Sequence, residues 1–197
     1  MIIGICGKSC SGKSTLSTEL DKYFDRKCIT VEIDKIGHYV LTLDEVRDDL
    51  VKYFGSSILR NGNINRKYLS KIVFSSDEKM GILANITWPY MEREIDKILD
   101  NNKDGIVILD YLLLPITKYL DICDFKILFD IPYEIRKERA IRRDGISEEE
   151  FLLRDQASIE FDYNYFDYVI RNNDKETYRR MVKLLWVVFY IQGVLIL

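Results

Sequence analysis

The sequence predicts an α/β fold: a doubly wound parallel sheet of about five strands, with an inserted helical subdomain and a helical lid. Two observations predict it. Short, continuously apolar segments alternate with stretches of helical spacing, as expected for strands buried on both faces between helices. A glycine-rich turn also joins the first such segment to the first helix. A length of 197 residues suits one core with an insertion, so we expect residues 1–197 to form a single domain.

The first strand, helix and strand are expected within residues 1–33. Residues 1–6 form a short apolar run closed by Gly7, and residues 28–33 form a second such run. Between them, residues 12–25 carry apolar side chains at helical spacing, namely Leu16, Leu20, Tyr23 and Phe24. A strand, a helix and a strand in this order predict the start of a parallel sheet.

Residues 35–102 are predicted to be mostly helical, with breaks at Gly55 and at the turn-rich residues 60–63. We expect Asn65 to cap a helix that ends at Phe74. A longer helix, from about residue 76 to residue 99, contains Pro89 as an expected bend. This is more helix than a crossover between two strands requires. Part of the region is therefore predicted to be an insertion.

The second half of the sheet is expected from two apolar runs, residues 105–110 and 125–130, each ending in an aspartate. A short strand at residues 168–170 would complete the sheet. Helices are predicted between the strands at residues 125–130 and 168–170, and after the last strand. The C-terminal apolar run, residues 184–197, is too short to span a membrane, so we expect a helix packed on the sheet or a partner contact.

The segment between the last two predicted strands has the features of a mobile lid. Residues 132–143 read as a helix with a basic last turn, and Gly145 follows as a hinge. Ser147 with Glu150 forms a capping box for the next helix. We expect the lid to span residues 139–160.

The turn after the first strand matches the pattern G-x-x-x-x-G-K-[ST] at every fixed position. Its residues are Gly7, Lys8, Ser9, Cys10, Ser11, Gly12, Lys13 and Ser14. The two glycines permit backbone angles that turn successive N–H groups inward to hold an anion. The following helix adds the positive end of its dipole. The motif predicts a P-loop fold that binds ATP through these residues and Thr15, with Lys13 on the β- and γ-phosphates and Ser14 on Mg²⁺.

Several features favour a kinase over other proteins with this loop. A GTPase would carry an Asn-Lys-x-Asp stretch, which the sequence lacks, and motor ATPases are usually larger. Asp34 follows the second strand, where it would accept a proton from an attacking hydroxyl or else cap the next helix. Asp110, at the end of another strand, would hold Mg²⁺ through water or cap the following turn.

A cluster of arginines is the remaining candidate for the site. Arg136, Arg139 and Arg143 fall on one helical face, which would clamp the transferring phosphoryl group. A solvated face paired with nearby acidic residues is the alternative, and Arg142 and Lys137 are assigned to it. Beside the Gly145 hinge, Arg139 is the predicted catalytic arginine and Arg143 a predicted ATP contact.

Taken together, these motifs resemble the dephospho-coenzyme A kinase family over roughly residues 2–173. The segments that match are Glu32-Ile33-Asp34, residues 65–74 with Asp77-Glu78-Lys79, Leu109 to Leu113, residues 139–147 with Gln156, and residues 167–172. The resemblance implies transfer of the ATP γ-phosphate to the ribose 3′-hydroxyl of dephospho-coenzyme A, the last step of coenzyme A biosynthesis. It makes Asp34 the general base, Arg139 a lid contact to the phosphates, and the inserted helices the acceptor site.

The sequence departs from the family pattern at four positions. Glu32 replaces an aspartate, Trp88 replaces the histidine of a His-Pro pair, Tyr111 replaces a proline, and Pro115 replaces an acid. These positions belong to the acceptor side in the family. A nucleoside or nucleotide kinase of the same fold therefore stays an alternative, as does a non-catalytic nucleotide-binding module whose apolar tail docks a partner.

Composition narrows the partners and the compartment. A net charge of −3 argues against nucleic acid and leaves a small-molecule substrate. The four cysteines contain no CxxC pair and the chain has one histidine, which argues against zinc and for reduced thiols. No basic, apolar leader precedes the first strand. We expect a cytoplasmic protein without a membrane span, as a monomer or small homo-oligomer.

Overall fold

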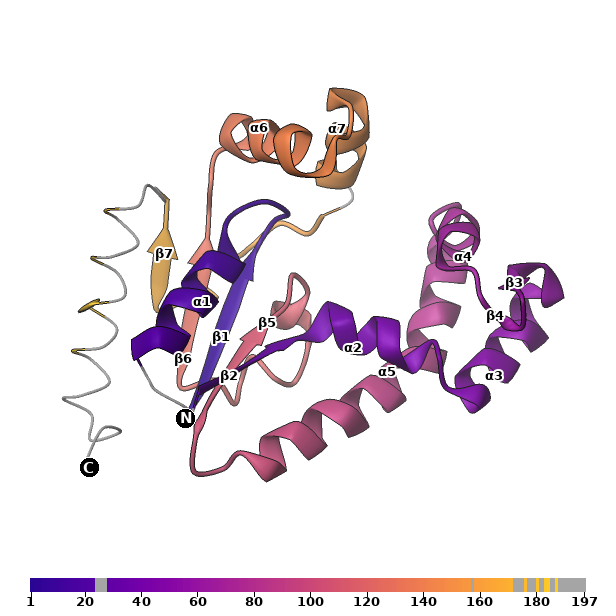
Figure 1. The fold of residues 1–197 in the computed structure, drawn as a ribbon, viewed down its shortest axis with the longest axis horizontal. Coiled ribbons are helices and arrows are strands. Elements are labelled where there is room, and N and C mark those ends of the chain that lie inside the picture. Colours follow the sequence, from indigo (N-terminus) through magenta and orange to yellow (C-terminus); the bar gives the residue numbers. More distant parts are fainter. Residues whose placement is uncertain are drawn as a thin grey trace. The chain divides into compact units, whose positions relative to one another are not determined.

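The computed structural model describes residues 1–23, 28–156 and 158–171, with five further residues between 176 and 187. It divides into two compact units (Figure 1). Residues 1–31 with 102–197 form the sheet unit, and residues 32–101 form the helical unit. The helical unit occupies nearly the same span as the region 35–102 that reads as helical in the sequence.

The sheet unit contains five strands in the order β2-β5-β1-β6-β7. Its elements are β1 (Ile2–Gly7), α1 (Lys13–Tyr23), β2 (Cys28–Glu32), β5 (Ile106–Asp110), η3 (Leu114–Ile116), β6 (Phe125–Phe129), α6 (Tyr133–Asp144), α7 (Glu148–Gln156), η4 (Tyr163–Tyr165) and β7 (Tyr168–Ile170). β1 pairs in parallel with both β5 and β6, and β6 pairs in parallel with β7. The predicted α/β fold with five strands is confirmed.

The core of the sheet unit joins the central strands to α1. Ile3 and Ile5 of β1 are fully buried, as are Leu16 and Leu20 of α1. These four residues belong to one apolar cluster with residues of β5, β6 and β7. The helical spacing seen in the sequence therefore does produce the buried face of α1, although the side chains of Tyr23 and Phe24 lie outside those described. This packing holds the turn between β1 and α1 at one end of the sheet.

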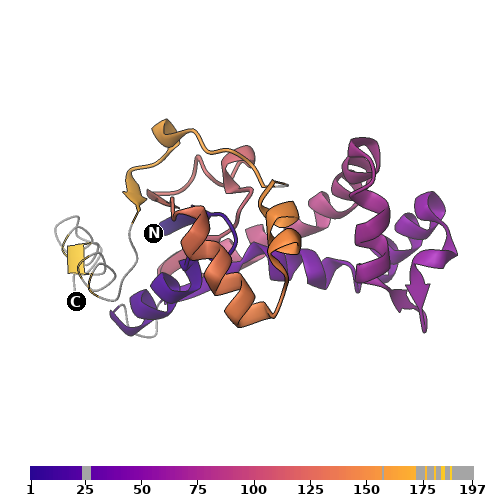
Figure 2. The same cartoon turned by 90° about the horizontal axis from the view of Figure 1, so that it is seen from above.

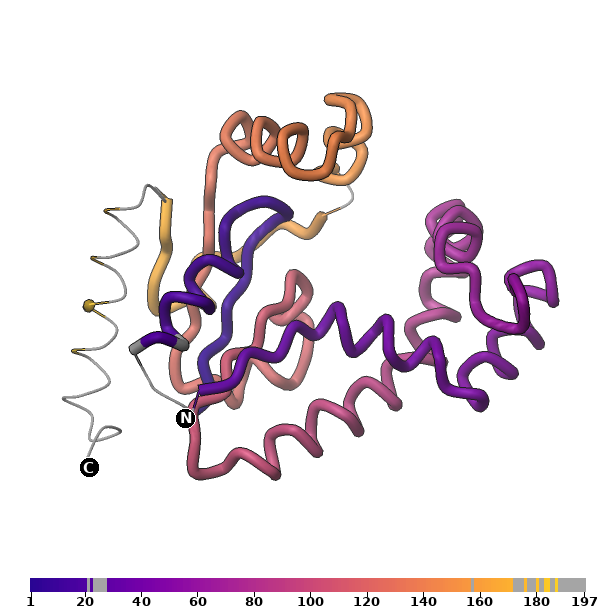
Figure 3. Tube along the Cα trace, in the orientation of Figure 1, coloured from indigo at the N-terminus to yellow at the C-terminus, as the bar shows by residue number. Residues whose placement is uncertain are grey.

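The helical unit has its own apolar cluster. Its elements are α2 (Ile33–Val40), α3 (Asp44–Phe54), η2 (Ser56–Ile58), β3 (Leu59–Arg60), β4 (Asn63–Ile64), α4 (Arg66–Val73) and α5 (Asp77–Asn101). α2 runs alongside the long helix α5, and α3 and α4 pack on α5 as well (Figure 3). The shared cluster comprises Val46, Leu50, Ile58, Leu69 and Val73.

Local signals in the helical unit are confirmed in part. The Asn65 side chain accepts a hydrogen bond from the Tyr68 N–H at 3.2 Å, as predicted for a helix cap. The turn-rich segment is more ordered than a simple break, because β3 and β4 pair as an antiparallel hairpin. Asn61 and Gly62, with φ of 52° and 79°, supply the positive angles that a two-residue hairpin turn requires. Pro89 lies inside the single helix α5.

The predicted lid region is a pair of adjoining helices, α6 and α7 (Figure 2). α6 ends at Asp144 and is followed by Gly145, whose φ of 66° is left-handed. Ser147 caps α7 by accepting from the Glu150 N–H at 3.1 Å, as the sequence predicts.

The prediction for the apolar run 184–197 falls on residues that, except for Leu184 and Val187, lie outside the described part of the chain. Among the described helices, none combines the length and apolarity that crossing a membrane requires.

Candidate active site

Three adjacent strands of the sheet unit end at one edge. β1 ends at Gly7, β5 ends at Asp110, and Asp130 follows the last residue of β6. Because all three strands run in parallel, their carboxyl ends bring the glycine-rich loop and two carboxylates together. The strand order reverses direction on either side of β1, which is where ligands of open α/β sheets bind.

The backbone angles of the loop explain why two of its positions are glycine. At Gly7, φ is 150°. A Cβ there would lie 2.8 Å from the Phe129 carbonyl oxygen and the Ser11 hydroxyl oxygen, so any side chain would collide. Gly12 has φ of 94°. Cys10 adopts φ of 61°, a left-handed angle that is uncommon for a residue with a side chain. The loop thus takes a tight course between β1 and α1.

Lys13 folds back over the loop it closes. Its Nζ donates a hydrogen bond to the Gly7 carbonyl oxygen at 2.8 Å. The same Nζ lies 3.8 Å from Oδ1 of Asp110, whose side chain is only 12% exposed. A partly desolvated lysine beside a carboxylate at a strand end therefore faces the inside of the loop. Such charges interact more strongly than they would in water.

The other loop residues line the surface around Lys13. Ser14 and Thr15 are exposed in the first turn of α1, at the positive end of its dipole. Ser9 Oγ lies 3.7 Å from Cys10 Sγ. Lys8 reaches across to the lid segment, where its Nζ lies 2.9 Å from Oε1 of Glu160. Since Glu160 is 91% exposed, this ion pair is weak in water.

Two lid arginines approach the loop from above. Figure 3 shows the β1–α1 turn passing below α6. Arg139 Nη1 donates to the Cys10 carbonyl oxygen at 3.4 Å. Arg143 is exposed and donates through Nε and Nη2 to Asp144, at 2.7 and 2.9 Å. That bond raises the pKa of Arg143 above its ordinary value, with a smaller contribution from the Cys10 thiol.

Arg136 differs in its surroundings from Arg139 and Arg143, although the sequence places all three on one helical face. Its side chain is buried and donates to Asp155 and to the Ile131 carbonyl oxygen, away from solvent. Helical spacing places Arg136, Arg139 and Arg143 on one face, but Arg136 is buried, Arg139 is half-buried and Arg143 is exposed. Arg136 thus lies in different surroundings from Arg139 and Arg143, and its part in a phosphoryl clamp stays a prediction.

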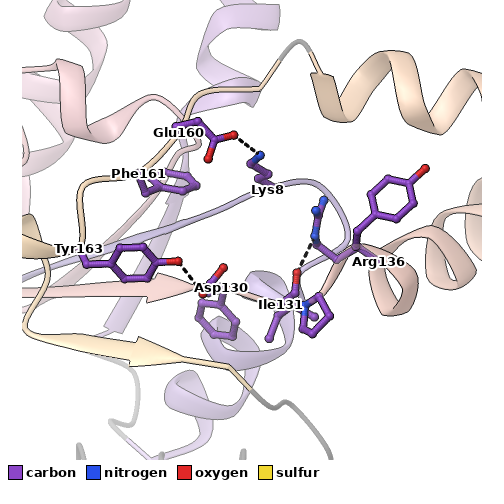
Figure 4. A pocket seen from close by; sticks show the side chains of 10 residues that line it. Lys8, Asp130, Ile131, Arg136, Glu160, Phe161 and Tyr163 are labelled. Carbon is purple, nitrogen blue, oxygen red and sulfur yellow. Dashed lines mark hydrogen bonds and ion pairs between the residues drawn. The ribbon is translucent and has the colours of Figure 1, made fainter.

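A small cavity adjoins the loop on the β6 side (Figure 4). Its volume is about 200 Å³. The Tyr163 hydroxyl donates to Asp130 Oδ2 at 2.7 Å, and this bond raises the pKa of Tyr163. Sequence reasoning missed this cavity, although Asp130 at a strand end was a signal for it. Residues that line it are Lys8, Phe129, Asp130, Ile131, Pro132, Tyr133, Arg136, Glu160, Phe161 and Tyr163.

Asp34 belongs to the helical unit. It is exposed in the first turn of α2, two residues after β2 ends. The Glu32 side chain, at the N-cap of α2, makes no capping hydrogen bond.

Two of the residues that depart from the family pattern have defined surroundings. Trp88 donates its indole N–H to Glu92 Oε1 at 3.0 Å on α5. Tyr111 is buried in the sheet unit, directly after β5.

Sequence relatives agree on one family. The family model of dephospho-CoA kinase matches residues 1–177. The dephospho-CoA kinase of Aquifex aeolicus is 38% identical over 192 residues, which cover 92% of this chain and 94% of the relative. That of Fusobacterium nucleatum is 35% identical over 177 residues, covering 88% of this chain and 90% of the relative.

Solved structures agree in fold. The crystal structure of TT1252 from Thermus thermophilus has a TM-score of 0.82 at 25% identity, covering 95% of this chain and 97% of that one. A dephospho-CoA kinase from Campylobacter jejuni has a TM-score of 0.66 at 23% identity, covering 98% of each chain, a likeness of fold alone. Matched along most of its length, this chain belongs to the dephospho-CoA kinase family and is a P-loop kinase.

Proposed function

We propose that this protein transfers the γ-phosphate of ATP to the ribose 3′-hydroxyl of dephospho-CoA. The observation that carries the proposal is the loop closed by Lys13, with Asp110 beside it and Arg139 against its backbone. A lysine, a carboxylate and an arginine around a nest of amides are the groups that phosphoryl transfer uses. Family membership supports the acceptor.

ATP would lie along the loop from Gly7 to Ser14 and Thr15. Backbone N–H groups and the α1 dipole would hold the phosphates, and Lys13 would neutralise charge on the β- and γ-phosphates. In the structure the Lys13 ammonium donates a hydrogen bond to the Gly7 carbonyl oxygen. A short rotation of the side chain would bring the ammonium to the phosphates. Arg139 would stabilise the charge that develops on the transferring group.

Mg²⁺ fits an oxygen donor in the first turn of α1 and another at the end of β5. The Ser14 hydroxyl and the Asp110 carboxylate are oxygen donors of the kind that Mg²⁺ prefers, with Asp110 acting through water. Within the described residues, no group of three or more His, Cys, Asp or Glu side chains forms a cation site. That suits Mg²⁺ in a kinase, which is held by few protein groups together with phosphate oxygens. The ion would offset phosphate charge.

Asp34 is the proposed general base, and the helical unit the proposed acceptor site. The Asp34 carboxylate would take the proton of the 3′-hydroxyl as the hydroxyl oxygen bonds to the γ-phosphorus. The bond from that phosphorus to the β–γ bridging oxygen breaks, and ADP leaves with the electron pair. Residues 139–160 would act as the lid that excludes water.

A panel of acceptors tests the proposal. ADP release by purified protein would be followed with ATP, Mg²⁺ and each of dephospho-CoA, several nucleosides and several nucleoside monophosphates, and products would be identified by mass. We expect turnover with dephospho-CoA and a product heavier by one phosphoryl group. Turnover with a nucleoside but none with dephospho-CoA would refute the acceptor. ATP binding without transfer to any acceptor would favour a non-catalytic module.

We expect Arg139→Ala to lower kcat by about 10²-fold while changing the KM for dephospho-CoA by less than about threefold. The reason is that a guanidinium aimed at the transferring phosphoryl group stabilises charge that exists mainly in the transition state. Steady-state kinetics would measure both constants. Arg142→Ala removes an exposed arginine from the same helix and should leave both unchanged. A raised KM with unchanged kcat would place Arg139 in the acceptor site instead.

Cys10 offers a direct probe of ATP binding. Burial raises the pKa of the Cys6 thiol, and that of Cys123 to about 12, so these two thiols stay protonated and unreactive. With Cys28 changed to serine, alkylation would report on Cys10, which is half-buried in the loop. ATP at ten times its Kd should slow alkylation about tenfold. Equal rates with and without ATP would contradict nucleotide binding at this loop.

A further inference from the structure

A buried ion pair joins the two ends of the helical lid. Arg136 on α6 is 5% exposed, and its Nη1 donates to Oδ1 of Asp155 at 2.5 Å. Its Nε donates at 2.8 Å to the carbonyl oxygen of Ile131, in the turn between β6 and α6. Asp155 lies in the last turn of α7. One guanidinium therefore links the turn before α6 to the last turn of α7.

Aromatic packing surrounds this pair. The guanidinium carbon of Arg136 lies 5.8 Å from the ring centre of Phe151, a buried residue of α7. Phe151 also packs on Tyr133 at the start of α6, with ring centres 5.3 Å apart. A charged guanidinium that donates to two separate acceptors, Asp155 and the Ile131 carbonyl oxygen, has a defined direction in such surroundings, whereas apolar packing alone tolerates small shifts. The pair thus fixes how α6 and α7 meet.

Arg139 stands one helical turn after Arg136 on the same helix. Its hydrogen bond to the Cys10 carbonyl oxygen spans 3.4 Å, so a small rotation of α6 would separate the two groups. We infer that Arg136 and Asp155 are positioning residues that hold Arg139 over the phosphate loop. The inference rests on the proposed role of Arg139 in phosphoryl transfer. Arg136 itself is buried, with its guanidinium engaged by Asp155 and the Ile131 carbonyl oxygen.

Asp155→Asn tests the inference because it removes the charge and keeps the shape. We expect kcat for dephospho-CoA phosphorylation to fall about tenfold with a KM change below about threefold, since small misplacements of a catalytic group cost that much. A second readout needs no activity. In protein carrying Cys28→Ser, nucleotide-free alkylation of Cys10 should speed up about threefold or more, because Arg139 no longer covers the loop.

Two further variants separate positioning from stability. Arg136→Met/Asp155→Leu replaces the ion pair by apolar contact, which often preserves stability. We expect its melting temperature to stay near that of the wild type while kcat stays low and Cys10 stays reactive. Arg154→Gln is the matched control, because it breaks an exposed 2.6 Å pair with Glu150 on the same helix. It should change neither readout.

Wild-type kcat and wild-type Cys10 reactivity in Asp155→Asn would overturn the inference. Full kcat in the apolar double variant would overturn it as well, because packing would then suffice to place Arg139. If Asp155→Asn fails to fold, kcat and the Cys10 alkylation rate of Arg136→Met/Asp155→Leu test the inference instead. A wild-type protein without turnover on dephospho-CoA would count against the proposed function, and the alkylation rates would still decide the positioning.

Discussion

Lys13→Ala should reduce kcat by about 10²-fold or more. The Lys13 ammonium is a preorganised charge, held 2.8 Å from the Gly7 carbonyl oxygen and 3.8 Å from Asp110. Once ATP is bound and the side chain has turned to the phosphates, this charge is already in place when negative charge develops on the transferring phosphoryl group, which is why its loss slows the chemical step. ADP release at saturating dephospho-CoA and ATP would measure the change.

Lys22→Ala is the matched control for Lys13. Lys22 lies in the last turn of the same helix, is exposed, and pairs with Glu19 one turn earlier. Its removal should leave kcat within about twofold, since exposed pairs contribute little. Near-wild-type activity in Lys13→Ala would mean that the loop holds no phosphate. Equal losses in both variants would point to damage of α1 rather than to a catalytic charge.

Asp34→Asn should lower kcat by about 10²–10⁴-fold, the range that a positioned general base contributes. Asparagine keeps the size and the hydrogen-bonding oxygen but cannot accept the hydroxyl proton. ATP binding should be unchanged, because the proposed phosphate contacts come from the loop and Asp34 is proposed to act on the acceptor. Kinetics with dephospho-CoA and equilibrium binding of ATP would together measure the two effects.

The competing explanation for Asp34 is electrostatic support of α2, since an acid in the first turn stabilises a helix. Asp44→Asn controls for it, because Asp44 is also exposed in the first turn of a helix, α3. We expect normal turnover in Asp44→Asn and a small loss of thermal stability. If Asp34→Asn behaved in the same way, Asp34 would be a helix-stabilising residue and another group would have to take the proton.

Local patterns predicted much of this molecule because they depend on neighbours in the chain. The Asn65 cap, the Ser147 cap and the buried stripe of Leu16 and Leu20 each involve residues within a turn or two of each other. The glycine-rich loop also has a local signal, since the backbone angles at Gly7 and Gly12 are ones that glycine permits. These local predictions hold in the folded protein because tertiary packing favours the same local conformations.

Arg136 shows where local patterns fail. Its spacing from Arg139 and Arg143 placed all three on one helical face, yet burial against α7 separates it from the others. Its partner Asp155 is 19 residues away, and Lys8 and Glu160 are 152 residues apart. No spacing rule links such residues, because the contacts form only when the sheet unit folds.

By itself the sequence determined the α/β class, the position of the phosphate loop and the family, since these rest on short segments with strict steric or chemical demands. Only the tertiary structure decided which charged side chains are buried, which meet the loop and which hold the lid together. The reason is physical: an arginine's role depends on what covers it, and desolvation and distance are properties of the folded chain rather than of its residue order.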